Sequence, residues 1–234
     1  MSKVQNSKNV PQFGWFRRGF RAVFYFFVKN ASFVIFLLVY RARGLHRERM
    51  PLTGPLLVAS NHQSHFDPPC IGGFARRRLS YIAQSGLFKF KPFGWVIESL
   101  GSIPINQEAG DAGAIREVIR RLDEGDAVLI FPEGTRCEKG EIEEFKRGVM
   151  LLVRKAKCAV QPVAIEGSFG AWPRFNKFPK LFGHRILVNY GTPISHDELM
   201  KNGNDAAMER LRREITLLHE ELKVKLHEDQ RPLR

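Results

Sequence analysis

Residues 56–67 read Leu-Leu-Val-Ala-Ser-Asn-His-Gln-Ser-His-Phe-Asp, so a short apolar run passes directly into polar residues. An uncharged apolar run of this length is typical of a buried β-strand. Asp67 is followed by Pro68 and Pro69, which predicts that Asp67 caps a helix whose first position is proline. Strands joined to helices in this way build α/β proteins, so we expect that fold class and a polar site where the strand ends.

Strand-like and helix-like segments continue to alternate after residue 50. Asp111 and Gly125 bracket one helix as cap and stop, and residues 195–198 have the spacing of a capping box. This alternation predicts a mostly parallel sheet flanked by helices. The expected strands are 55–60, 79–84, 101–105, 127–131, 159–165 and 185–190, and the expected helices are 68–76, 86–98, 111–124, 146–157, 195–200 and 204–226.

The N-terminal arm is basic and aromatic. Residues 1–50 carry ten Lys or Arg against one acid, and therefore +9 of the net charge of +13, together with 11 of the chain's 26 aromatic residues. Such a segment can bind single-stranded nucleic acid by base stacking. Here, however, the aromatics stand within long apolar runs such as 31–40, which favours a membrane surface. We expect membrane lipids as a partner and no nucleic acid.

Two arrangements of this arm are open. Two short helices, over residues 15–29 and 31–43, could lie in one leaflet with their cations at the lipid headgroups. Alternatively, residues 22–40 approach the roughly 20 residues that a tilted bilayer span needs. Lys29 falls in the middle of that stretch, where a charge is costly. Monotopic association is therefore the first expectation, and a single span the second.

His62 and Asp67 supply the parts of a proton-abstracting pair. An imidazole titrates near neutral pH, and a carboxylate can fix its tautomer. Both residues also have plainer interpretations, because an Asp before Pro often only caps a helix and a lone His is often structural. A metal site that includes His65 is a further alternative. The sequence has no paired-histidine motif or zinc-knuckle cysteine spacing, so we expect no metal.

A second polar segment, Phe-Pro-Glu-Gly-Thr-Arg-Cys over residues 131–137, follows the apolar run 127–130. Gly134 allows a ligand to approach the backbone, Arg136 offers a planar fork for a phosphate, and Glu133 can hold a hydroxyl or orient the arginine. Taken alone, the segment is better explained as a polar connection between a strand and a helix. The sequence lacks a Gly-rich nucleotide loop, a dinucleotide fingerprint and a Gly-x-Ser-x-Gly elbow, which removes support for kinase, dehydrogenase and serine-hydrolase functions.

Together the two segments resemble the motifs of the lysophosphatidic acid acyltransferase family, the glycerolipid acyltransferases with an Asn-His-x4-Asp (HX4D) motif. Asn61, His62 and Asp67 match its first motif, residues 131–136 match its third, and residues 161–165 are similar to its fourth. The resemblance covers roughly residues 45–195. It implies three parts: a membrane-associated helical arm (1–44), an acyltransferase catalytic domain (45–195), and a C-terminal helical segment packed on that domain (196–234), with a frayed end.

The resemblance also implies an activity. A fatty acyl group would move from acyl-CoA or acyl carrier protein, the co-substrates, to the free hydroxyl of a lysophospholipid, with no cofactor. The expected acceptor is 1-acyl-glycerol-3-phosphate, which gives phosphatidic acid, and the expected location is the cytoplasmic face of a membrane. His62 would be the catalytic base and Asp67 its catalytic partner. The residues expected to bind substrate are Asn61, Gln107, Glu133, Gly134, Thr135 and Arg136.

Gln107 departs from the family's pattern, because it stands where an arginine implicated in holding the acceptor phosphate usually closes the second motif. Glutamine can hydrogen-bond a phosphate but brings no charge. Arg136 or the cluster 76–78 could supply the missing charge. This departure motivates one alternative, acyl transfer to a non-phosphate lysolipid such as lyso-ornithine lipid. A separate alternative of a different class is a catalytically inactive lipid-binding protein.

Overall fold

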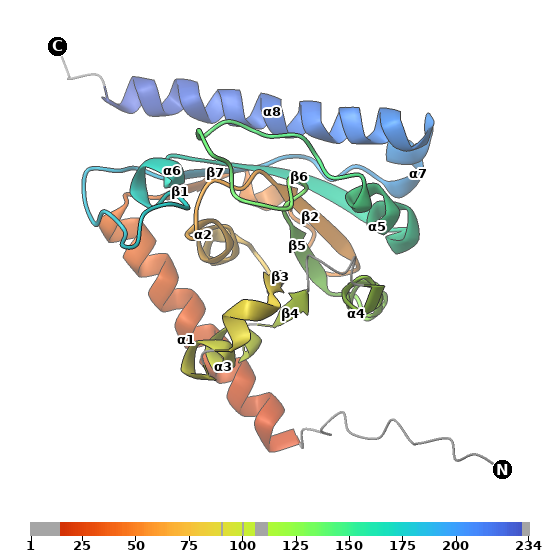
Figure 1. The fold of residues 1–234 in the computed structure, drawn as a ribbon, viewed down its shortest axis with the longest axis horizontal. Coiled ribbons are helices and arrows are strands. Elements are labelled where there is room, and N and C mark those ends of the chain that lie inside the picture. The colour runs from red at the N-terminus through yellow and green to blue at the C-terminus, as the bar shows by residue number, and fades with distance from the viewer. Residues whose placement is uncertain (1–14, 90, 100, 106–111, 231–234) are drawn as a thin grey trace.

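The computed structural model describes residues 15–89, 91–99, 101–105 and 112–230. These residues form a seven-stranded sheet in the order β1-β7-β6-β2-β5-β3-β4 (Figure 1). Neighbouring strands from β6 to β4 are parallel, whereas β7 is antiparallel to β6 and parallel to the edge strand β1. The strands are β1 (Arg43–Leu45), β2 (Leu56–Ser60), β3 (Leu79–Gln84), β4 (Ser102–Ile105), β5 (Ala127–Ile130), β6 (Ala159–Glu166) and β7 (Leu187–Tyr190). The prediction of a mostly parallel α/β sheet is confirmed.

Helices cover both faces of the sheet, because successive strand residues point to opposite sides. Leu57 and Ala59 share one apolar core with α4, α5, α7 and α8, while Leu56 and Val58 share another with α1 and α2. Figure 1 shows α8 lying along one side of the sheet and α1 along the other. The helices are α1 (Trp15–Val39), α2 (Asp67–Phe74), α3 (Lys91–Ser99), α4 (Ala112–Asp123), α5 (Gly148–Ala156), α6 (Ser168–Ala171), α7 (His196–Met200) and α8 (Gly203–Gln230), with 3-10 turns η1 (Arg47–Arg49) and η2 (Ser85–Phe88).

The arm contains one continuous helix, α1, and the prediction of two short helices is wrong. No Gly or Pro interrupts the chain near the expected break, and the two polar residues there are accommodated. The Lys29 ammonium donates to the carbonyl of Ala75 at 2.8 Å, and the Asn30 amide donates to the carbonyl of Phe26 at 2.7 Å. Among the described helices, none is long and apolar enough to cross a membrane.

Other boundaries follow local chemistry. Ser195 accepts a hydrogen bond from the amide of Glu198 at 3.2 Å, which confirms the predicted cap of α7. Gly125 has φ +86° just beyond α4, as expected of a helix stop, whereas Asp111 lies outside the described residues. The single helix expected over 86–98 is instead η2 followed by α3. Pro92 explains the late start of α3, since proline is accepted only in the first turn of a helix.

Candidate active site

Three strand ends meet at one edge of the sheet. Strand β2 lies between β5 and β6 and is parallel to both, in a register that pairs Ala59 with Ile130 and Pro162. The segments that follow these strands therefore emerge side by side, as ligand-binding segments do in open α/β sheets. Both sequence motifs lie here, joined by a third segment after β6 that the sequence did not single out.

His62 and Asp67 form the expected pair. The Nδ1 atom of His62 lies 2.8 Å from Oδ2 of Asp67, and the imidazole is 17% exposed while the carboxylate is fully buried. Because Nδ1 is bonded to the acid, Nε2 is the ring nitrogen left to meet a substrate. The imidazole also stacks on the ring of Phe131, with centroids 3.8 Å apart and planes at 13°. The imidazole is thus fixed both by its hydrogen bond to Asp67 and by stacking on Phe131.

Asp67 does not cap α2, so that expectation is wrong. The N-cap residue is Phe66, Asp67 is the first helical residue, and Pro68 follows at the second position. The carboxylate turns back toward the preceding loop, where Oδ2 accepts the amides of Gln63 at 2.6 Å and Ser64 at 2.7 Å. Its other oxygen, Oδ1, accepts the hydroxyl of Ser168 at 2.6 Å. A buried carboxylate with this many donors is fixed in position and keeps its charge compensated.

Glu133 clamps the backbone of His62 from the neighbouring segment. Its Oε1 accepts the His62 amide at 2.8 Å, its Oε2 accepts the Glu143 amide at 3.1 Å, and the residue is 1% exposed. The carboxylate therefore holds main chain rather than a hydroxyl or Arg136, contrary to the expectation from sequence. Burial raises the pKa of the Glu133 carboxyl to about 7, although both amides act in the opposite direction.

Asn61 belongs to the sheet and not to the surface of the site. Its side-chain amide donates to the carbonyl of Ile165 and accepts the amide of the same residue, each at 2.9 Å, and it is 1% exposed. This two-way bond ties the end of β2 to β6. In the structure Asn61 therefore shapes the strand end that carries His62, and its contact with substrate stays a prediction.

The remaining residues of the segment 131–137 form a turn with a basic tip. Gly134 has φ +73°, and a Cβ there would lie 3.1 Å from Cγ of Lys146, so both conformation and space favour glycine. Thr135 and Arg136 follow and are partly exposed. The Arg136 guanidinium donates to Nε2 of His65. Gln107 lies outside the described residues.

His65 is held neutral by its surroundings. Partial burial, together with the positive charge of Arg136, lowers the pKa of the His65 imidazole to about 4. The guanidinium of Arg174 donates to the main-chain carbonyl of Arg136 at 3.4 Å and lies 3.5 Å from Glu138, so this turn carries a second cation. Such a cluster matches a phosphate or another anion next to His62.

Sequence reasoning missed several residues that bond the His62–Asp67 loop from behind. Gln63 donates to the carboxylate of Glu166 at 2.9 Å, and Glu166 also binds the buried imidazole of His219 on α8. Ser168 bonds both Asp67 and, at 3.2 Å, the side-chain oxygen of Gln63. The sequence offered only one signal for these residues, which is their position along the chain. Glu166 and Ser168 stand at the end of an apolar run, and Gln63 stands within the first motif.

One group of metal-ligand type occurs among the described residues: Glu141, His219 and Glu220. The Lys223 ammonium donates to Glu141 at 2.8 Å and to Glu220 at 3.0 Å, and His219 binds Glu166. Because a cation already bonds both of its carboxylates, we assign no metal to this group.

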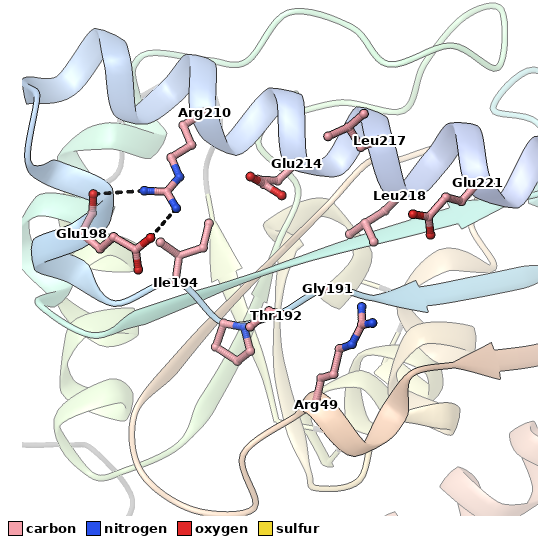
Figure 2. Close-up of a pocket in the computed structure, with 11 residues that line it drawn as sticks. Arg49, Gly191, Thr192, Ile194, Glu198, Arg210, Glu214, Leu217, Leu218 and Glu221 are labelled. Carbon is pink, nitrogen blue, oxygen red and sulfur yellow. Dashed lines mark hydrogen bonds and ion pairs between the residues drawn. The ribbon is translucent and has the colours of Figure 1, made fainter.

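A cavity of about 350 Å³ lies between α8 and the segment that follows β7 (Figure 2). It is distant from His62, because Gly191 and Ile194 run back beside Pro162 and Val160 toward the amino end of β6. Arg210 reaches across it to Glu198, and the pair forms the dashed contacts in Figure 2. The residues that line this cavity, with their paired charges, are therefore not part of the site at the strand ends.

Comparisons with known proteins agree with this geometry. A family model described as Acyltransferase matches residues 42–166. A 1-acyl-sn-glycerol-3-phosphate acyltransferase of Streptococcus pneumoniae is 28% identical over 181 residues, which cover 75% of this chain and 64% of that protein. The protein of the same name in Pseudomonas aeruginosa is 33% identical over 173 residues, covering 68% and 65%. A lyso-ornithine lipid O-acyltransferase of that organism is 33% identical over 112 residues, covering 47% and 43%.

The chain thus spans less than two thirds of the length of these curated relatives. Its fold is similar to the crystal structure of the 1-acyl-sn-glycerophosphate (LPA) acyltransferase PlsC from Thermotoga maritima, with a TM-score of 0.77 and 23% identity over 93% of this chain and 85% of that one. The family model covers more than half of the chain and contains both motif segments. The chain therefore belongs to the acyltransferase family that its Asn-His-x4-Asp motif indicates.

Proposed function

We propose that this protein is an O-acyltransferase that moves a fatty acyl group from an acyl thioester to the free hydroxyl of a lysophospholipid. The proposed acceptor is 1-acyl-glycerol-3-phosphate, the product is phosphatidic acid, and the donor is acyl-CoA or acyl carrier protein. The observation that carries the proposal is the 2.8 Å contact between His62 and the buried Asp67, with the imidazole partly open to solvent. The relatives named for this activity support it.

The chemistry follows from the two ring nitrogens. Nε2 of His62 takes the proton of the acceptor hydroxyl while that oxygen bonds to the thioester carbonyl carbon. The carbon–sulfur bond then breaks, and the leaving thiolate takes the proton back from the imidazolium. Asp67, bonded at Nδ1, stabilises the charge that the ring carries between these steps. General-base catalysis of this kind is worth about 10²–10⁴ in rate.

Arg136 and Arg174 support a phosphate-bearing acceptor. Arg136 lies in the segment that follows β5 and is partly exposed, and Arg174, from the connection between α6 and β7, donates to its main-chain carbonyl. They offer the positive charge that Gln107 does not bring. The second candidate is acyl transfer to lyso-ornithine lipid, which the named relative in Pseudomonas aeruginosa favours. We further propose that residues 1–44 associate monotopically with the cytoplasmic face of a membrane and that residues 45–195 form the catalytic domain.

The decisive experiment replaces His62 in the purified protein. His62→Ala should lower turnover by at least about 10²-fold, because the general base is removed. His227→Ala is the matched control, since His227 is exposed on α8 and far along the chain from the motif. Acyl-CoA and acyl carrier protein are each offered with 1-acyl-glycerol-3-phosphate and with lyso-ornithine lipid, and products are identified by mass spectrometry.

Each outcome decides one part of the proposal. Wild-type turnover by His62→Ala would refute the pair as the catalytic device. A strong preference for lyso-ornithine lipid would replace the acceptor while keeping the chemistry. The absence of product from every pairing with the folded wild-type protein would favour the inactive lipid-binding alternative.

A further inference from the structure

The connection between α6 and β7 exposes large apolar side chains beside the candidate active site. We call residues 172–185 the aromatic loop. Phe175, Phe178, Leu181 and Phe182 are 69%, 71%, 56% and 76% exposed. Isolated exposed apolar residues are ordinary on a protein surface, but four within eight positions concentrate apolar side chains in one loop, which points to an interaction surface.

The base of the loop is firmly built, so the exposure of its tip is a defined feature. The Lys180 amide donates to the carbonyl of Ala171 at 2.8 Å, and the Trp172 indole donates to the carbonyl of Asn176 at 3.0 Å. The ring of Phe175 packs edge-on against Phe169, with centroids 6.0 Å apart. The neighbouring rings of Phe178 and Phe182 are left facing outward.

The charged residues of the loop's own sequence all have one sign. From Gly167 to His196 the chain contains no acidic residue and carries four cations: Arg174, Lys177, Lys180 and Arg185. Arg174 lies 3.5 Å from Glu138 of another segment, and the Lys177 ammonium lies 5.6 Å from the ring centroid of Phe178. Aromatic rings set among lysines match the boundary between the acyl chains and anionic headgroups of a bilayer.

The loop also lies close to the end of α1. The ring of Trp172 is 5.0 Å from that of Phe66, and Phe66 is in turn 5.3 Å from Phe36 and 5.0 Å from Tyr40. In Figure 1 the loop projects from the same edge of the molecule at which α1 ends. Trp172 additionally contacts the motif itself, since its carbonyl accepts the Ser64 hydroxyl at 2.7 Å. Lipid bound at the loop would lie next to His62.

We infer that the aromatic loop is a second membrane contact, separate from α1, which inserts Phe178 and Phe182 among the lipids of an anionic bilayer. Lys177 and Lys180 meet the headgroups, and the loop holds the mouth of the site against the surface from which an acceptor arrives. The inference concerns binding and not turnover. It can therefore fail while the proposed acyl transfer stands, and the reverse also holds.

The test uses the full chain and vesicles of phosphatidylcholine with or without phosphatidylglycerol. The double substitution Phe178→Ser with Phe182→Ser should weaken binding to the anionic vesicles by about tenfold, because two rings no longer leave water. Lys177→Gln with Lys180→Gln should weaken binding to those vesicles about tenfold and leave binding to pure phosphatidylcholine nearly unchanged. Leu217→Ser with Val224→Ser is the matched control, since these residues are 56% and 58% exposed on α8.

A labelled variant tests insertion directly. The three native cysteines are buried, so a polarity-sensitive dye on Phe182→Cys reports from the loop alone, and Val224→Cys serves as its control. A blue shift on adding anionic vesicles is expected for the loop and not for α8. Unchanged vesicle binding by the Phe178/Phe182 variant, an equal loss in the α8 control, or a dye that stays in water would each overturn the inference. Loss of binding to acidic acyl carrier protein alone, with vesicle binding intact, would also overturn it and assign the loop to that protein.

Discussion

Two histidines three positions apart show how the surroundings of a residue decide its role. His62 bonds a buried carboxylate at Nδ1, which leaves Nε2 to meet a substrate. His65 faces the guanidinium of Arg136 at Nε2, which requires a ring that keeps its lone pair. Both histidines were visible in the sequence, but only contacts distant in the chain separate the base from its neutral neighbour.

Arg136→Gln tests this assignment. The pKa of the His65 imidazole, lowered to about 4 by burial and by Arg136, should rise when the positive charge is removed. It should remain below 6.5, since burial is the larger cause. Titration of the histidine ring protons by NMR measures the change, with Arg154→Gln on the exposed face of α5 as the control. An unchanged His65 pKa would show that Arg136 does not act on this ring.

At the scale of elements, the site depends on the order of strands in the sheet. The sequence predicted that β2 and β5 end in functional segments, because each apolar run passes into polar residues. It could not predict that β6 lies on the other side of β2, since strand pairing leaves no local signal. Ser168 and Glu166 were missed for that reason, and the bond between Asn61 and Ile165 was not foreseen because Ile165 also comes from β6.

Ser168→Ala tests the contribution of the segment after β6. Ser168 acts through Asp67 as a positioning residue, and its hydroxyl bonds Oδ1 of that carboxylate at 2.6 Å. Losing a hydrogen bond to a charged, buried group should lower kcat by about tenfold or more, with KM little changed. Steady-state kinetics with the preferred acceptor measure this split.

The control for Ser168→Ala is Ser195→Ala, which removes the N-cap of α7. That change should cost about 1 kcal/mol of stability and leave kcat unaltered. Equal kcat losses in the two variants would mean that Ser168 supports the fold in general and not the orientation of Asp67.

Some elements could not be predicted from sequence patterns. Strand β1 has three residues, one of them Gly44, and is too short for a period to be recognised. The N-terminal segment was divided at Lys29 and Asn30 because a charge interrupts its apolar run. In the structure, that charge is bonded to the end of α2, a tertiary contact that overrides the local signal. By contrast, the helices expected over 111–124 and 195–200 agree with α4 and α7 to within one residue at each end.

At the scale of the whole molecule, α1 has two faces with different surroundings. Phe36 and Tyr40 are buried in the core that α1 shares with α2 and the sheet. Val23, Phe26, Phe27, Ile35 and Leu38 are instead at least 53% exposed. The aromatic loop adds its own rings near the end of this helix. The helix therefore supports the fold on one side, and on the other presents apolar surface to its surroundings.

This division predicts opposite results for two substitutions of the same residue type in one helix. Phe36→Ala should lower the free energy of unfolding by about 3 kcal/mol, because it leaves a cavity in the core. Phe27→Ala, at a residue 65% exposed, should change it by no more than about 0.5 kcal/mol yet weaken binding to anionic vesicles. Urea denaturation and vesicle sedimentation measure the two effects. If Phe27→Ala destabilised the protein as strongly as Phe36→Ala, the face of α1 that carries Phe27 would be covered by protein in solution. That result would contradict the assignment of this face to the bilayer.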